Sequence, residues 1–327
     1  MFNQVDYRGK HFDVPDLTFG SQKIHPEAPT QVLAKLSHST SHEAYEKKHP
    51  ILKDLNTVWN LEKFKTPRTP IHIAHLENQK SQEQFSKSGA VNVLDLPLKF
   101  PGSEFRIPQE LSQFLPIIQL VANYESLINR DCYDEYYCYA TVDQKLVKAG
   151  SLQREAPCHV DGFQGALWKP KVKINHTYVI SDSVPTTYYL QPFDFSGLDE
   201  AKHNFFWEMN YQVAQTNSQY AWQPKPFELN LIDAYTVHRG SPSPVDVVRT
   251  WLRLSFEVRI FNRLGNAHNP MFSYDWDMIP RDIEGLNLIA YHTDSDPSLR
   301  VFPHQKIDGT PHESRKTRTQ PNLKPRG

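Results

Sequence analysis

The second half of the chain shows the most regular alternation of apolar and polar positions. Within residues 171–182, alternate side chains are apolar, aromatic or histidine, and they share one face of an extended segment. They are Val172, Ile174, His176, Tyr178 and Ile180. Further segments rich in aromatic and β-branched residues, with turn signals at their ends, are predicted to be strands: 136–147, 185–195, 227–242 and 247–264. Several short strands separated by turns predict a barrel or a sandwich.

The first half mixes helical and extended patterns. A helix is predicted over residues 39–65, where apolar side chains recur every three or four positions from Ile51 to Leu61 behind serines that can cap it. A second helix is predicted over residues 105–130, with Pro116 expected to kink or restart it. Two strands are predicted in this half: 71–76 and 91–98.

No flexible linker divides the chain, and we expect three regions. Residues 1–130 form a mixed α/β region that packs on the core and begins with an extended arm holding a short strand near residues 16–20. Residues 131–302 form a β-rich core, with an inserted loop and helix at 196–220. Residues 303–327 contain Pro, Lys and Arg with few apolar side chains, which predicts a disordered basic tail. The predicted fold class is α+β.

The composition narrows the class of protein and the compartment. The 327 residues carry 36 Lys and Arg against 37 Asp and Glu, and this balance does not favour nucleic-acid or membrane-surface binding, although the basic tail leaves contact with a polyanion open. The chain shows no secretory signal and no apolar run of ~20 residues, the length of a membrane span. Its three cysteines do not make a disulfide framework and predict reduced thiols. We therefore expect a cytoplasmic protein.

Candidate chemistry begins with a His-x-Asp triplet in the segment PCHVDGF, residues 157–163. On an extended chain His159 and Asp161 share a face, so both side chains can converge on one ion, while Cys158 points to the opposite face and is expected in the core. A third ligand is offered by His238 in LIDAYTVHRGSP. Two imidazoles and one carboxylate form the facial triad that is typical of non-haem Fe(II) enzymes.

Two arginines on the strand after the distal histidine could anchor an anionic co-substrate. Arg249 and Arg253 are four positions apart in RTWLRLSF and therefore point to the same side of a strand, together with Ser255. A buried guanidinium is costly unless it meets an anion, and its planar fork matches a carboxylate better than an ammonium group does. The pair therefore indicates an anion site.

The order of these elements resembles the 2-oxoglutarate/Fe(II)-dependent dioxygenases. The resemblance rests on HVDGF, NHTYVISDSVPTTYYLQPF, LIDAYTVHRGSP and RTWLRLSF, and it covers residues 130–265. It implies a double-stranded β-helix, a cupin-like jelly roll, with flanking N-terminal helices. It also implies Fe(II) held by His159, Asp161 and His238, with 2-oxoglutarate and O2 as co-substrates.

The same resemblance assigns the arginines. Arg249, eleven positions after His238, would bind the distal carboxylate of 2-oxoglutarate. Arg253 begins an R-x-S triplet with Ser255 that some members use, so it competes for this role or faces an anionic substrate. Asp233 resembles a structural polar residue that precedes the ligand strand in several members.

The activity implied by the resemblance is hydroxylation of an unactivated C–H bond of a small molecule, such as an amino acid or a natural-product intermediate, with release of succinate and CO2. The carboxylate of Asp161 favours hydroxylation over halogenation, because related halogenases carry a small residue there. Two alternatives stay open: an oxygenase acting on a protein side chain or a methylated nucleobase, and a cupin-like metal-binding protein without oxygenase activity. His176 either lines the pocket or is a hydrogen-bonded core histidine, and His72 and His75 are treated as ordinary.

Overall fold

The computed structural model describes residues 3–5, 11–13, 49–87, 89, 91–154, 156–161, 172–198 and 205–278. The predicted strand near residues 16–20 and the predicted tail at 303–327 lie outside these residues. Strands β1 (Asn3–Val5) and β2 (His11–Asp13) pair with each other as a two-stranded sheet. No helix among the described residues is long and apolar enough to cross a membrane.

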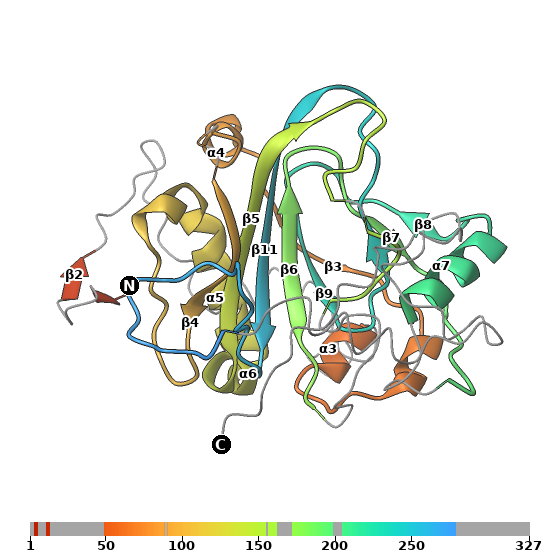
Figure 1. Cartoon of the computed structure of the whole chain (residues 1–327), viewed down its shortest axis with the longest axis horizontal. Coiled ribbons are helices and arrows are strands. Elements are labelled where there is room, and N and C mark those ends of the chain that lie inside the picture. Colours follow the sequence, from red (N-terminus) through yellow and green to blue (C-terminus); the bar gives the residue numbers. More distant parts are fainter. Residues whose placement is uncertain are drawn as a thin grey trace, which may run out of the picture.

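A six-stranded sheet forms the centre of the molecule (Figure 1), in the order β3-β9-β6-β11-β5-β4. Its strands are β3 (Ile71–His75), β4 (Asn92–Lys99), β5 (Tyr137–Val147), β6 (His176–Ser181), β9 (Glu228–Asp233) and β11 (Val247–Glu257). Every strand pairing in the described part of the chain is antiparallel. Each of these strands falls on a segment predicted to be extended, although the strand predicted over residues 247–264 ends at Glu257. Because β3 and β4 form the two edges, strands from both sides of residue 130 share one sheet.

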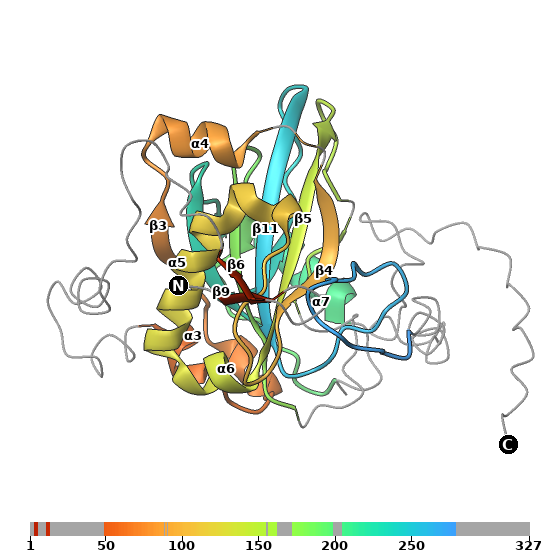
Figure 2. The same cartoon turned by 90° about the vertical axis from the view of Figure 1, so that its left-hand side faces the viewer.

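Helices cover one face of this sheet (Figure 2). The elements are the 3-10 helix η2 (Gln109–Phe114) and the α-helices α5 (Leu115–Ile128) and α6 (Arg130–Glu135). Pro116 lies in the first turn of α5, where its missing N–H leaves no hydrogen bond unmade, so the predicted restart of the helix at this proline is confirmed. Alternate side chains of β11, such as Leu252 and Leu254, join Ile118 and Val121 of α5 in the largest hydrophobic core.

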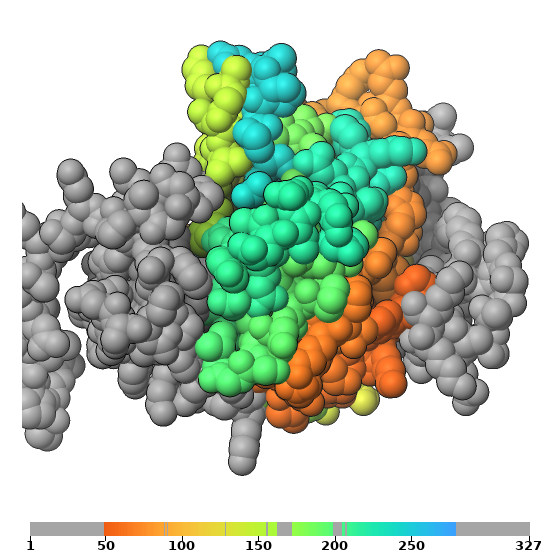
Figure 3. All heavy atoms as spheres, turned by 90° about the vertical axis from the view of Figure 1, so that its right-hand side faces the viewer, coloured from red at the N-terminus to blue at the C-terminus, as the bar shows by residue number. Residues whose placement is uncertain are grey.

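The opposite face of the large sheet carries a small sheet and a helix, so these parts of the described chain form three layers. These elements are β7 (Thr187–Tyr189), β8 (Ala221–Trp222), β10 (His238–Arg239) and α7 (Phe205–Gln215), with sheet order β10-β7-β8. Tyr188 of the small sheet packs on Val179 and Ile232 of the large one. Figure 3 shows this face, with the green residues of the small sheet and α7 at its centre. The helix predicted within residues 196–220 is confirmed as α7.

The predicted helix over residues 39–65 is wrong in its described part. Only α3 (Pro50–Asp54) and the 3-10 helix η1 (Leu61–Lys65) form there, and residues 39–48 lie outside the described chain. The backbone leaves the helical path at Leu55, whose ψ is 146°, and the Trp59 N–H then donates to the Val172 carbonyl at 2.8 Å. Pairing with a distant segment therefore overrides the helical spacing. A short helix, α4 (Gln79–Phe85), forms instead in the connection between β3 and β4.

The segment 227–242, predicted as one strand, is two strands in different sheets. β9 ends at Asp233, whose carboxylate accepts from the Tyr235 N–H at 3.1 Å and from the Thr236 hydroxyl at 2.7 Å. Such bonds let an aspartate stabilise a turn. Arg68 lies 3.3 Å from the same carboxylate. The turn carries the chain across to β10, so Asp233 has the structural part that the sequence indicated.

Candidate metal centre

His159 and His238 lie directly opposite each other at the end of the small sheet. The His159 N–H donates to the His238 carbonyl at 2.9 Å, and the His238 N–H donates back to the His159 carbonyl at 2.9 Å. His159 forms an isolated bridge rather than part of a longer strand. The two imidazole rings have centroids 4.5 Å apart. The backbone thus holds both side chains in register.

Both imidazoles are oriented by a carbonyl group two residues upstream. Nδ1 of His159 lies 2.8 Å from the Pro157 oxygen, and Nδ1 of His238 lies 2.8 Å from the Thr236 oxygen. A carbonyl oxygen can only accept, so each Nδ1 carries the hydrogen and each Nε2 presents a bare lone pair. This is the arrangement found in metal-ligating histidines, whose other ring nitrogen donates to a fixed acceptor.

Asp161 completes a three-residue cluster with the two histidines. One ligand atom from each residue lies within 4.8 Å of the other two. Burial, together with the charge of His238, lowers the pKa of His159 to about 4, so its imidazole is neutral at physiological pH. Burial alone would raise the pKa of Asp161, but Arg253 and the histidines hold it below its usual value. Two imidazoles and one carboxylate at this spacing fit a divalent transition metal.

Arg253 is paired with two carboxylates rather than left free for a ligand. Its Nη1 donates to Asp161 Oδ1 at 3.1 Å, and its Nη2 donates to Asp95 Oδ1 at 2.8 Å. The same Nη2 lies 3.2 Å from the Thr141 hydroxyl. The sequence expectation that Arg253 faces a co-substrate or an anionic substrate therefore differs from its contacts, because its charge is already shared.

Arg249 is buried without a carboxylate in direct contact among the described residues. Its Nε donates to the Ser183 carbonyl at 2.9 Å, and its Nη1 donates to Gln153 Oε1. Burial lowers its pKa to about 10, although the carboxylates of Asp182 and Asp143 oppose this shift. A guanidinium that is charged, desolvated and held only by neutral acceptors is suited to receive an anion.

Tyr188 packs beside the histidine cluster. Its ring centroid lies 5.7 Å from that of His238, opposite which it pairs in the small sheet. Burial raises its pKa, the charge of Asp161 raises it further and Arg249 lowers it, so the phenol stays protonated. Tyr188 therefore lies beside His238 and is influenced by the charges of both Asp161 and Arg249.

Ser255 is not brought into contact with either arginine by any described hydrogen bond. It is buried, and its hydroxyl lies 3.4 Å from that of Thr177. Its predicted part in co-substrate binding stays a prediction. Cys158, by contrast, is buried in the hydrophobic cluster beneath the small sheet, as its position beside His159 indicated, and all three cysteines are free.

Three residues of this site were not found from the sequence. They are Asp95, Gln153 and Tyr188. Asp95 interrupts the apolar run VNVLDLPL, and a charge within such a strand is a usable signal of a buried partner. Gln153 and Tyr188 carry no comparable signal, since their parts depend on contacts between distant segments.

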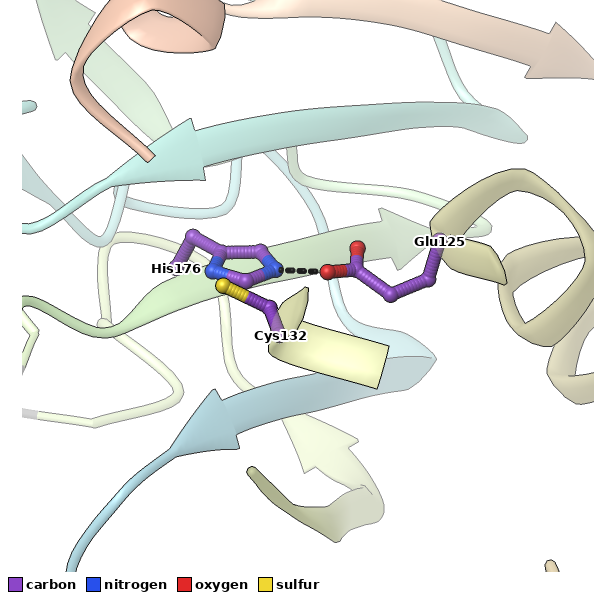
Figure 4. A group of neighbouring side chains, drawn as sticks. All are labelled: Glu125, Cys132 and His176. Carbon is purple, nitrogen blue, oxygen red and sulfur yellow. Dashed lines mark hydrogen bonds and ion pairs between the residues drawn. The ribbon is translucent and has the colours of Figure 1, made fainter. Parts of the chain in front are cut away.

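A second titratable cluster lies on the other side of the large sheet (Figure 4) and consists of Glu125, Cys132 and His176. Glu125 on α5 accepts from His176 Nε2 at 2.8 Å and from the Tyr178 hydroxyl at 2.5 Å. Burial raises the pKa of the Cys132 thiol to about 12, so it is protonated. Because His176 and Tyr178 both meet the Glu125 carboxylate directly, these three residues form a buried hydrogen-bond network beside the Cys132 thiol. His176 is thus a core histidine and does not line the site.

Comparisons with known proteins give only distant likenesses. No protein-family model matches the chain, and no curated protein sequence matches it. Among solved structures, EvdO2 from Micromonospora carbonacea var. aurantiaca is 15% identical with a TM-score of 0.30, over 45% of this chain and 64% of that one. EvdO2 complexed with 2-oxoglutarate is 14% identical with a TM-score of 0.30, over 57% and 93%. AviO1 from Streptomyces viridochromogenes Tue57 is 9% identical with a TM-score of 0.34, over 64% and 93%.

The chain spans less than two thirds of the first of these EvdO2 structures. At TM-scores of 0.30 to 0.34 the likeness identifies neither a shared fold nor a shared activity. The chemistry of the chain's own side chains remains the basis for a function.

Proposed function

We propose that the protein is an Fe(II)- and 2-oxoglutarate-dependent oxygenase that hydroxylates a C–H bond of a small molecule. The two facing antiparallel sheets are in this proposal the halves of a double-stranded β-helix. The observation that carries the proposal is the convergence of His159, Asp161 and His238. Both histidines donate an Nδ1–H to a carbonyl oxygen, and each Nε2 is left with a free lone pair. The buried, carboxylate-free Arg249 is the second support.

We assign one set of side chains to metal binding and another to co-substrate binding. His159 and His238 would hold Fe(II) through Nε2, and Asp161 would hold it through a carboxylate oxygen. Arg249 would receive the distal carboxylate of 2-oxoglutarate with the donors that Ser183 and Gln153 leave free. Bound Fe(II) with 2-oxoglutarate and O2 would supply the oxidising chemistry, ending in a hydroxylated product, succinate and CO2.

Tyr188 and the surrounding core would control what enters this site. The buried phenol keeps its proton, so it can donate to an oxygen atom of a ligand and does not add negative charge. Packing of Tyr188 on Val179 and Ile232 excludes water from that side. A dry surrounding strengthens the attraction between Arg249 and a carboxylate.

An anaerobic titration tests the proposal. Addition of Fe(II) and then 2-oxoglutarate to metal-free protein should produce a visible charge-transfer band that saturates at one Fe(II) per chain. His159→Ala should abolish the band, and Arg249→Ala should demand at least ~10-fold more 2-oxoglutarate, because it removes hydrogen bonds to a charged group. His72→Ala, which changes an exposed histidine on β3, is the matched control. Folded wild-type protein that gives no band would refute the oxygenase assignment, and metal binding without a band would leave a metal-binding protein.

The substrate class needs its own measurement. Succinate release above the uncoupled background should rise with a member of a panel of amino acids and natural-product-like compounds. Stimulation by a polypeptide or by methylated nucleic acid, weakened by salt, would instead favour the macromolecular alternative.

A further inference from the structure

We propose that Asp95 is a positioning residue for the metal centre. Acting through Arg253, it would set how much negative charge Asp161 presents to the ion. The inference rests on the proposed metal centre and concerns a residue that no ligand pattern in the sequence contains.

The contacts form a continuous hydrogen-bond network across three neighbouring strands. Asp95 on β4 accepts from Arg253 on β11 at 2.8 Å, and Arg253 donates with its other terminal nitrogen to Asp161 at 3.1 Å. Thr141 on β5 holds Asp95 in this network. Its hydroxyl donates to Asp95 Oδ1 at 3.1 Å and accepts from the Asp95 N–H at 3.1 Å. All these residues are largely withdrawn from water, with 15% of the Arg253 side chain and 8% of the Asp95 side chain exposed.

A bulge in β4 places Asp95 in this position. Val93 pairs with Val142 and Leu96 pairs with Ala140, so two residues of β4 lie opposite the single Thr141. Val93 and Leu96 both pack into the core beneath the helices. Asp95 has a φ of 50°, which non-glycine residues rarely adopt, and its carboxylate reaches the face that carries the metal centre. A strained residue at such a place is typical of a functional site.

Charge provides the physical reason for the arrangement. Arg253 alone would neutralise Asp161 and weaken its attraction for a cation. The second carboxylate, Asp95, draws on the same guanidinium and leaves the group of three with one net negative charge. Partners of ligating groups commonly change metal affinity by ~10–100-fold when they are removed.

The test measures Co(II) binding to the full-length protein by absorbance, with no turnover required. Asp95→Asn should weaken Co(II) binding by about 10-fold, because Arg253 then neutralises Asp161. The double variant Asp95→Asn with Arg253→Gln restores one net negative charge and should return to within about threefold of the wild type. Rescue by a second substitution is not expected if Asp95 only supports packing.

Asp246→Asn is the matched control. Asp246 is exposed, and it forms an ion pair with Lys148 just beyond the ends of β5 and β11. Thermal melting monitored by circular dichroism establishes that each variant is folded. If the wild type binds no Co(II), the proposed function fails and the inference fails with it. If the wild type binds Co(II) and loses it in His159→Ala, two results would overturn this inference alone: unchanged affinity in Asp95→Asn, or a double variant no better than the single one.

Discussion

The contacts of Nδ1 separate the two candidate ligand histidines from the histidine of the buried network. In His159 and His238, Nδ1 lies against a carbonyl oxygen and Nε2 is bare. In His176, Nε2 meets Glu125 and the ring stacks on Phe256 at 5.2 Å between centroids. The residue type is therefore the same, but only the first two present a lone pair toward a shared position.

The lowered pKa of His159 predicts an acid-sensitive metal-free protein. Its pKa is about 4 in the folded chain against an ordinary 6.5, so between these values the unfolded chain binds a proton that the folded chain does not. Stability must then fall as the pH is lowered from about 6.5 toward 4. In His159→Gln the loss of unfolding free energy between pH 7 and pH 5 should shrink by about 1–2 kcal/mol.

Urea denaturation in the presence of a chelator measures this difference. His72→Gln, at an exposed position of β3, should retain the full pH dependence of the wild type. Equal pH dependence in wild type and His159→Gln would mean that the imidazole of His159 is not desolvated in the folded chain.

Arg249 should affect the co-substrate and not the metal. In Arg249→Lys the charge remains but the planar fork is lost, so 2-oxoglutarate should bind ~10-fold more weakly while Co(II) affinity stays within about twofold. Isothermal titration with each ligand separates the two effects. Arg130→Lys, at an exposed ion pair with Asp134, is the control. A parallel loss of metal affinity would contradict the division of functions.

At the scale of elements, one buried carboxylate adds polar contacts to the apolar packing of α5 on the large sheet. Glu125 accepts from Nε2 of His176 and from the hydroxyl of Tyr178, both on β6, and all three side chains are buried. Burial of polar groups is tolerated when their hydrogen bonds are made. The helix layer is thus tied to the sheet by polar contacts on the side opposite the metal centre.

Removal of this carboxylate should therefore destabilise the fold without emptying the metal centre. Glu125→Ala leaves two buried donors without an acceptor and should lower the unfolding free energy by about 3 kcal/mol or more. Glu135→Ala, which breaks an exposed ion pair with Lys173, should cost less than about 1 kcal/mol. Urea denaturation gives both values. A drop in bound metal per folded chain in Glu125→Ala would show that this cluster holds an ion after all.

At the scale of the whole molecule, the alternating pattern was enough to place most strands, and the spacing of the His-x-Asp triplet was enough to expect His159 and Asp161 close together. Alternation reports which side chains share a face, and this is why the strand of Tyr178 and Ile180 was predicted correctly. Alternation did not report which of the two faces lies toward the helices and which toward the site. His176 could therefore be assigned either to the pocket or to the core. Only the packing of α5 on the sheet decides that question.

Features that depend on irregular backbone were not predictable in the same way. The turn at Asp233 divides one predicted strand between two sheets, and the bulge at Asp95 turns a carboxylate toward the site. Each depends on local hydrogen bonds that compete with regular pairing. The predicted helix over residues 39–65 is interrupted after Asp54 for a related reason, since tertiary pairing of the following residues outweighs helical spacing.

The reciprocal backbone bonds between His159 and His238 have a consequence for loading and release of an ion. They close a long loop of the chain, and the conformational entropy lost on closure grows with the logarithm of loop length. The free energy gained when the sheet forms offsets this entropy loss during folding, before any ion binds. An ion that dissociates therefore leaves the loop closed, and the next one can bind without a search by the polypeptide for the right pairing.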